Sequence, residues 1–176
     1  MKKLLILLIP LIFLTGCIRI PRLSNNSNIV NASFGTYQIN NLVKREDHST
    51  PNKVFYSLEK DKYETRPDNI SVEVGTNYYS KDEHLTFRRA IQEQLYRQVG
   101  RNAKITGTGI DTSKGNIVYK FLITKDNDKT EITQYYIVGD HKYVLVHETN
   151  FSRNPDLNIA AYNIVDTFEW KWLYEN

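Results

Sequence analysis

The sequence predicts an α+β fold in which an antiparallel β-sheet packs with two main α-helices as an α/β/α sandwich. Short segments alternate apolar and polar residues, and two longer segments repeat apolar residues at helical spacing. Their order is several strands, one helix, several more strands and a final helix. Runs of strands with segregated helices are typical of helices packed on an antiparallel sheet. We expect a single globular domain over residues 34–176.

The first strands precede the first helix. Residues 34–39, 54–58 and 70–74 have the composition of strands, and the last of these alternates isoleucine and valine with polar side chains. Asn40 and Asn41 provide a turn after the first strand. The charged stretch between the second and third strands, residues 59–68, is typical of a loop.

The first helix has clear start and stop signals. Ser80 and Glu83 form the pattern of a capping box, in which each side chain satisfies a free backbone amide at the start of a helix. Gly100 stands where the helix is expected to end. The stripe expected to face the core consists of Phe87, Ala90, Ile91, Gln94, Leu95 and Val99.

A meander of antiparallel strands follows this helix. The predicted strands are residues 105–110, 117–124, 132–138 and 143–148, with turns at residues 126–128 and 139–140. The second of these strands is apolar on both faces and is therefore expected to be central. Tyr135 and Tyr136 are adjacent in a strand, so one of them should point away from any one core.

The final helix is predicted to begin at Asn154, with Pro155 at its first position and Asp156 near the positive end of its dipole. Two tryptophans follow it, and we expect one to pack and the other to lie at a rim. The apolar stripe of the helix is Leu157, Ala160, Ala161, Ile164, Val165 and Phe168, extended by Trp172.

The order of these elements across residues 50–172, including the terminal helix, is similar to that of the PsbP-like domain family. That family comprises α/β/α sandwiches of photosynthetic accessory proteins and of many small bacterial lipoproteins. The resemblance implies a non-catalytic binding or assembly role. It transfers no site residues, because no specific motif carries it, and fold analogy alone does not establish function.

The N-terminal segment has the pattern of an export signal. Lys2 and Lys3 precede an apolar run of eleven residues, 4–14, which is shorter than the ~20 residues of a membrane-spanning helix. The run ends in Leu-Thr-Gly-Cys at residues 14–17, which resembles the lipobox of bacterial lipoproteins processed by the type II signal peptidase. The resemblance implies removal of residues 1–16 and a diacylglyceryl thioether on Cys17, often with a third acyl chain.

The lipobox-like segment predicts where the mature chain is located, and it predicts the membrane as a partner through the lipid on Cys17. Two or more acyl chains anchor a protein stably, so the mature chain is expected on the extracytoplasmic face of a cell membrane or outer membrane. Residues 17–33 are rich in Asn and Ser and are predicted to be a flexible tether. Cys17 is the single cysteine, so the domain must fold without an internal disulfide.

The charge balance argues against nucleic acid as a partner. The whole chain has 23 Lys and Arg against 20 Asp and Glu, and removing residues 1–16 takes away two lysines and no acid, which leaves 21 against 20. A nearly neutral domain has no general attraction to phosphates. The twelve tyrosines favour sheet packing, and an exposed subset of them could recognise an envelope protein or a glycan.

No catalytic, cofactor-binding or metal-ligating set is predicted. The four histidines are His48, His84, His141 and His147, and none has the spacing of a paired metal motif. His84 follows two acids, but neighbours on a helix diverge by about 100°. The segment from Asp126 lacks the glycine and the bidentate glutamate of a calcium loop.

The sequence therefore favours a surface-tethered, non-enzymatic binding or accessory module. An envelope hydrolase or a metal-dependent enzyme, with a site assembled from distant residues, is the alternative, and a cleft containing two or more histidines with acids close by would favour it. A purely structural envelope component is a third hypothesis, which a large self-complementary patch would favour.

Overall fold

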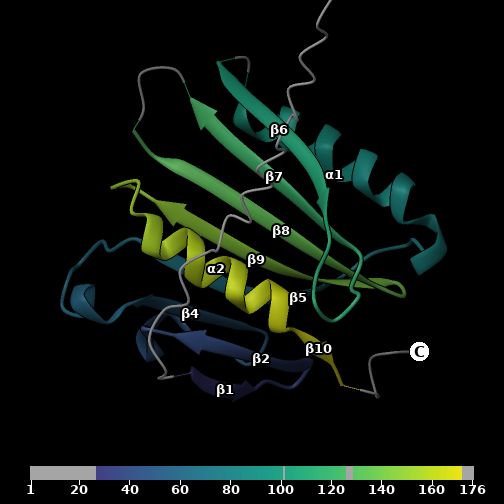
Figure 1. Cartoon of the computed structure of the whole chain (residues 1–176). Coiled ribbons are helices and arrows are strands. Elements are labelled where there is room, and N and C mark those ends of the chain that lie inside the picture. The colour runs from purple at the N-terminus through teal and green to yellow at the C-terminus, as the bar shows by residue number, and fades with distance from the viewer. Residues whose placement is uncertain (1–26, 101, 126–128, 172–176) are drawn as a thin grey trace, which may run out of the picture.

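The computed structural model describes residues 27–100, 102–125 and 129–171. Over these residues the chain forms two α-helices and two antiparallel sheets, one of seven strands and one of three (Figure 1). The predicted α+β class is confirmed. The predicted signal peptide, Cys17, the turn at residues 126–128 and Trp172 lie outside the described residues. Along the described part of the chain, no helix is both long and apolar enough to cross a bilayer.

The larger sheet has the order β3-β4-β5-β9-β8-β7-β6. The predicted meander forms its β6–β9 half, and β5 pairs with β9 along its whole length, from Asn69 opposite Thr149 to Thr76 opposite Lys142. The early strands are therefore added to the last strand of the meander. The bounds are β3 (Leu42–Lys44), β4 (Lys53–Leu58), β5 (Asn69–Thr76), β6 (Ala103–Ile110), β7 (Val118–Lys125), β8 (Glu131–Gly139) and β9 (Lys142–Asn150).

The helices α1 (His84–Val99) and α2 (Pro155–Thr167) cover opposite faces of the larger sheet (Figure 1). Each face has its own hydrophobic core. Tyr135 packs in the core beneath α2 and Tyr136 in the core beneath α1, and they are only 2% and 5% exposed. The two tyrosines do point to opposite faces, as predicted, and both are buried because the sheet is covered on both sides.

The predicted caps hold both helices in place. The Ser80 backbone N–H donates to Glu83 Oε2 at 3.0 Å, and this capping box opens a 3₁₀ turn, η3 (Lys81–Glu83), that leads into α1. Gly100 ends α1 with φ of 79°, a left-handed conformation that glycine adopts without strain. At α2 the Asn154 side chain accepts from the Asp156 backbone N–H at 3.1 Å. Of the stripe predicted for α1, Phe87, Ile91 and Leu95 are buried, whereas Gln94 is exposed.

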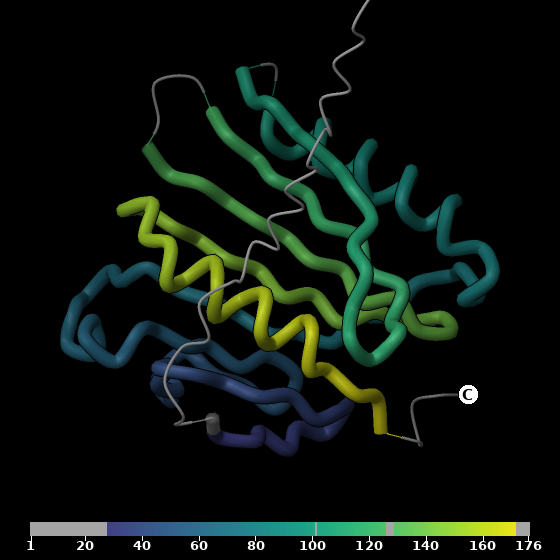
Figure 2. The backbone as a smooth tube through the Cα atoms, viewed as in Figure 1, coloured from purple at the N-terminus to yellow at the C-terminus, as the bar shows by residue number. Residues whose placement is uncertain are grey.

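The smaller sheet was not predicted. It has the order β1-β2-β10 and joins β1 (Ser27–Asn31) and β2 (Gly35–Asn40) to β10 (Glu169–Trp170), so segments from the two ends of the domain lie side by side (Figure 2). The prediction of a flexible tether up to residue 33 is therefore wrong for β1. Its apolar residues are few, but Val30 packs against the core beneath α2, and β2 supplies backbone partners for the whole strand.

Short elements between the strands complete the domain. Strand β3 and the 3₁₀ turns η1 (Glu46–His48) and η2 (Glu59–Asp61) carry no clear sequence signal. Asn41 has φ of 55°, which matches the predicted turn after the first strand. The turn between β8 and β9 is shifted by one residue from its predicted place, because Gly139 pairs with Lys142 and leaves Asp140 and His141 as the loop. A hydrogen bond of 2.8 Å between Tyr37 Oη and Tyr56 Oη links the two sheets.

Candidate functional site

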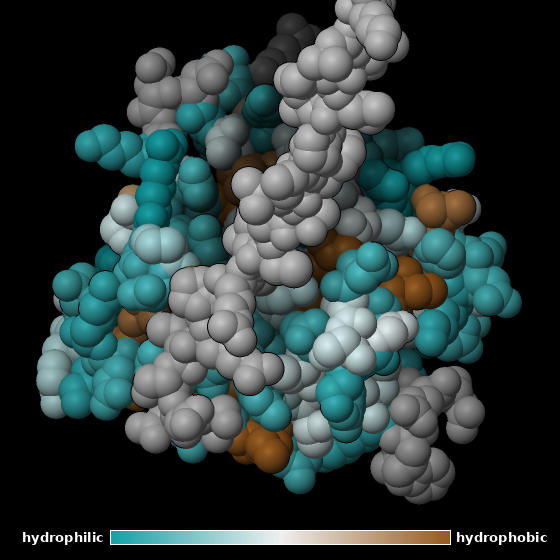
Figure 3. Space-filling model, viewed as in Figure 1, coloured by the Kyte–Doolittle hydropathy of each residue, from teal (hydrophilic) through white to brown (hydrophobic). Residues whose placement is uncertain are grey.

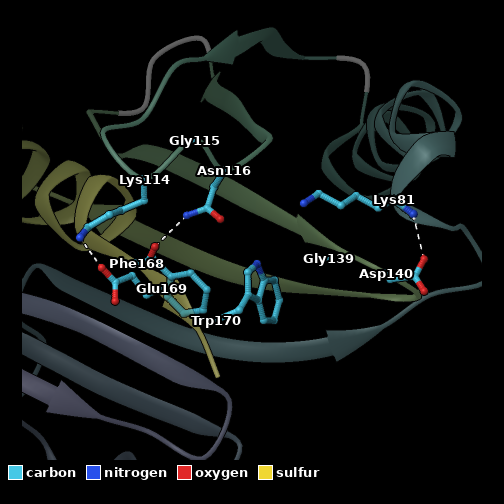
Figure 4. A pocket seen from close by; sticks show the side chains of 9 residues that line it. All are labelled: Lys81, Lys114, Gly115, Asn116, Gly139, Asp140, Phe168, Glu169 and Trp170. Carbon is cyan, nitrogen blue, oxygen red and sulfur yellow. Dashed lines mark hydrogen bonds and ion pairs between the residues drawn. The ribbon is translucent and has the colours of Figure 1, made fainter. Parts of the chain in front are cut away.

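A cavity of about 460 Å³ lies where β10 meets the β6–β7 loop, the β8–β9 turn and η3 (Figure 4). Segments that are far apart in the sequence thus meet at one place. We refer to this cavity as the Trp170 pocket. The residues that line it are Lys81, Lys114, Gly115, Asn116, Gly139, Asp140, Phe168, Glu169 and Trp170.

The β6–β7 loop holds one side of the Trp170 pocket against the end of α2. The Ser113 backbone N–H donates to Asp166 Oδ1 at 2.7 Å, and the Ser113 hydroxyl donates to the Asp166 carbonyl at 2.8 Å. Asn116 Nδ2 donates to the Phe168 carbonyl at 2.7 Å, and Lys114 forms an ion pair with Glu169. These contacts fix the residues that lead into Trp170 from outside that segment of the chain.

Trp170 forms the aromatic wall of the pocket and is held on several sides. Its indole lies edge-on to the Phe168 ring, with 5.0 Å between ring centroids, and Lys142 Nζ lies 5.4 Å from its centroid. Gly139 makes room for this arrangement, because a Cβ there would lie 2.9 Å from Trp170 Cζ2 and 3.0 Å from Lys142 Cγ. The prediction that one tryptophan packs is met by Trp170, which is half-buried against the core beneath α2.

Polar groups surround the opening of the pocket. The Lys81 backbone N–H donates to Asp140 Oδ1 at 3.1 Å, which ties η3 to the β8–β9 turn. The Lys81 side chain is exposed and extends over the pocket toward Asn116, and the indole nitrogen of Trp170 points to the same space (Figure 4). Asn116 Oδ1 and the Lys81 ammonium have no hydrogen-bond partner among the described residues. The pocket can therefore offer donors and one acceptor to a ligand.

The structure distributes the four histidines over separate environments. His84 Nδ1 lies 2.6 Å from Tyr119 Oη, and His147 lies between Gln134 and Thr149 at 3.1 and 3.2 Å on the face of the sheet that carries α1. Burial lowers the pKa of His147. His48 packs on the ring of Phe55, and His141 lies in the β8–β9 turn. Over residues 27–100, 102–125 and 129–171, no group of three or more His, Cys, Asp or Glu residues could hold a metal ion.

Glu148 is a buried acid that sequence reasoning missed. It lies on β9 facing α2, it is 1% exposed, and its Oε2 has no hydrogen-bond partner in the described part of the chain. Its Oε1 accepts from Asn150 Nδ2 at 3.3 Å, which is its single partner among the described residues. Burial raises the pKa of Glu148 to about 7. The alternation of Val144, Val146 and Glu148 in the predicted strand was a usable signal, because it places the carboxyl on a core-facing position.

The surface around the pocket contains both polar and apolar residues. The face of the molecule that carries α2 is mainly hydrophilic, with small separate apolar patches among the described residues (Figure 3). Elsewhere Tyr78 and Tyr63, which lie between strands, are 97% and 89% exposed, whereas the tyrosines on the described strands are buried or half-buried. Packing therefore accounts for most of the tyrosine content.

No protein-family model matches the chain, and no curated protein matches it in sequence. Among solved structures, it is similar to the solution structure of cyanobacterial PsbP (CyanoP) from Synechocystis sp. PCC 6803. The two share 11% sequence identity with a TM-score of 0.49, over 82% of this chain and 92% of that chain.

Proposed function

We propose that this chain is a lipid-anchored extracytoplasmic lipoprotein that acts as a non-enzymatic binding or accessory module of the cell envelope, with the Trp170 pocket as its binding site. The observation that carries the proposal is the pocket itself, in which a tryptophan wall is fixed by surrounding elements and polar groups remain available at the opening. A partner is expected among envelope glycans or envelope proteins.

The dimensions and the rigidity of the pocket suit ligand binding. Its volume lies within the range of ~300–1,000 Å³ that small-molecule sites occupy. The β6–β7 loop contacts Asp166, Phe168 and Glu169, so the wall is ordered before any ligand arrives. A preformed site loses less conformational entropy on binding than one that must first order its loops.

The proposed anchor rests on the lipobox-like residues 14–17. Ten peptide units separate Cys17 from Ser27, where β1 begins, and they span at most about 35 Å when fully extended. That length allows the domain to stand clear of the headgroups and to reach other envelope components. The predicted role of this segment is to connect the anchor with the domain.

Metabolic labelling tests the anchor. Cells that produce the full chain are grown with labelled palmitate, and wild type is compared with Cys17→Ser and with Ser24→Ala as a matched control. We expect label on wild type and on the Ser24 variant, and none on Cys17→Ser. Label that persists on Cys17→Ser, or an unlabelled wild type with an intact Met1, would refute the anchor.

Retention of envelope material tests the binding site. The full chain, purified in detergent and immobilised, is exposed separately to the polysaccharide and protein fractions of an envelope extract. Wild type is compared with Lys81→Glu, which alters the opening of the pocket, and with Lys104→Glu, an exposed charge on β6 that does not line it. We expect one fraction to be retained by wild type and by the Lys104 variant and lost by Lys81→Glu. Failure to retain either fraction, together with hydrolysis of an envelope substrate, would favour the enzyme alternative.

A further inference from the structure

We infer that the Trp170 pocket recognises a sugar ring that carries a carboxylate, with the ring against the indole and the carboxylate at Lys81. This inference rests on the proposed binding function and names the chemical class of its ligand. It follows from the combination of an aromatic wall with a cation at the same opening.

The aromatic wall suits a sugar ring. The face of an indole is the negative part of its quadrupole, and the aliphatic C–H bonds of a pyranose are weakly positive, so the two surfaces attract when stacked. The Trp170 indole packs against the Phe168 ring and lies close to Gly139, which has no side chain in its way. It therefore presents a fixed flat surface. The Asn116 Nδ2 group donates to the Phe168 carbonyl, which fixes the orientation of the amide. Its Oδ1 has no partner among the described residues and can accept a hydrogen bond from a sugar hydroxyl.

The distribution of charge around the pocket favours an anion over a neutral sugar. Both carboxylates at the opening are already engaged, Glu169 by Lys114 and Asp140 by the backbone N–H of Lys81. The Lys81 ammonium, in contrast, forms no ion pair within the described part of the chain. With Lys142 beside the indole, the wall and the opening hold three lysines and two carboxylates.

Two donors converge on the place where such a carboxylate would lie. The Lys81 ammonium extends over the pocket, and the indole nitrogen of Trp170 points into the same space (Figure 4). A carboxylate has two oxygens, and hydrogen bonds from a cationic donor to an anionic acceptor are about twice as strong as neutral ones. A neutral sugar would leave the Lys81 charge without a partner.

The test compares trigalacturonate with its methyl ester, which keeps the sugar rings and replaces each charged carboxylate by a neutral ester. The full chain is purified in detergent, and Trp172→Phe leaves Trp170 as the single tryptophan, because the sequence contains two. Binding is followed by the change in Trp170 fluorescence and confirmed by calorimetry. We expect the acid to bind at least about tenfold more tightly than the ester. Lys81→Gln should reduce that ratio to about one by weakening the binding of the acid, whereas Lys104→Gln should preserve the ratio.

Each other outcome has a distinct meaning. Equal affinity for the acid and the ester overturns the inference and leaves the proposed binding function intact, because the ring alone is then recognised. A preference for the acid that survives in Lys81→Gln overturns the placement of the carboxylate. If neither probe binds, the inference fails, and the proposed function fails with it only if the envelope fractions are not retained either.

Discussion

Replacement of the buried Glu148 by glutamine should stabilise the protein at alkaline pH and leave its stability nearly unchanged at acidic pH. The side chain is 1% exposed, and its neighbours compensate its charge only in part. Lys120 favours the ionised form, whereas Glu131 and Asp68 oppose it. The glutamine side chain has nearly the same shape as the protonated acid, so the substitution removes the charge and keeps the packing.

The magnitude follows from the pKa of the group in the two states. In the folded protein the pKa of Glu148 is raised from its ordinary value of 4.5 to about 7. Below pH 4.5 the carboxyl is protonated in both states and has no effect on the free energy of unfolding. As the pH rises from 4.5 to about 7, the unfolded chain releases the proton more readily and stability falls. Above pH 7 the loss reaches at most about 3 kcal/mol, since one pKa unit corresponds to about 1.4 kcal/mol.

Urea denaturation followed by circular dichroism measures this difference. The free energy of unfolding of Glu148→Gln minus that of wild type should be close to zero at pH 4.5 and should rise to between about 1 and 3 kcal/mol at pH 8. Any contribution of the histidines to the free energy of unfolding is the same in both proteins and cancels in the difference. Glu93→Gln, on an exposed position of α1, serves as the control and should follow wild type at every pH. A difference that does not change with pH, or a variant less stable than wild type at pH 8, would refute the reasoning.

Three further substitutions test the helix caps, the core and the wall of the pocket. Asn154→Ala should lower the free energy of unfolding by about 1 kcal/mol in urea denaturation, because the α2 cap is lost, and Asn154→Asp should retain most of it; equal losses would contradict a capping role. Phe121→Ala removes a fully buried ring from the core beneath α1 and should cost about 3–5 kcal/mol by the same measurement; a loss below about 1 kcal/mol would show that this core is not packed as described. Gly139→Ala should displace the indole and change the Trp170 fluorescence of a Trp172→Phe protein, whereas Gly109→Ala, where the nearest atom to a new Cβ is 3.8 Å away, should not; identical spectra would argue against close packing of the indole on Gly139.

Local signals predicted most of the regular elements. Ser80 and Glu83 at the 3₁₀ turn that leads into α1, Gly100 at the end of α1, and Asn154 with Pro155 at the start of α2 act through bonds and dihedral angles within a few residues. The alternation of apolar residues located the strands of the meander, because neighbouring side chains in a strand point to opposite faces. These features need no knowledge of the rest of the chain.

The Trp170 pocket was not predictable in the same way. It depends on Lys81, Asn116 and Trp170, which lie on three segments with no recognisable motif between them. The sequence placed Trp170 near a packing surface, but the ion pair between Lys114 and Glu169 links residues 55 positions apart. The alternation in β9 places Glu148 on the apolar face of the strand, but how completely that face is buried depends on the position of α2.

The sequence by itself determined where α1 and α2 begin and which residues alternate in β7, β8 and β9. It also carries the lipobox-like pattern from which the cellular location is predicted. Only the tertiary structure decided that β5 pairs with β9, that β1 joins the smaller sheet, and that a pocket forms beside β10. The physical reason is that the entropic cost of closing a loop changes slowly with its length. Many pairings of distant edges therefore cost nearly the same, and the burial of shared apolar faces selects among them.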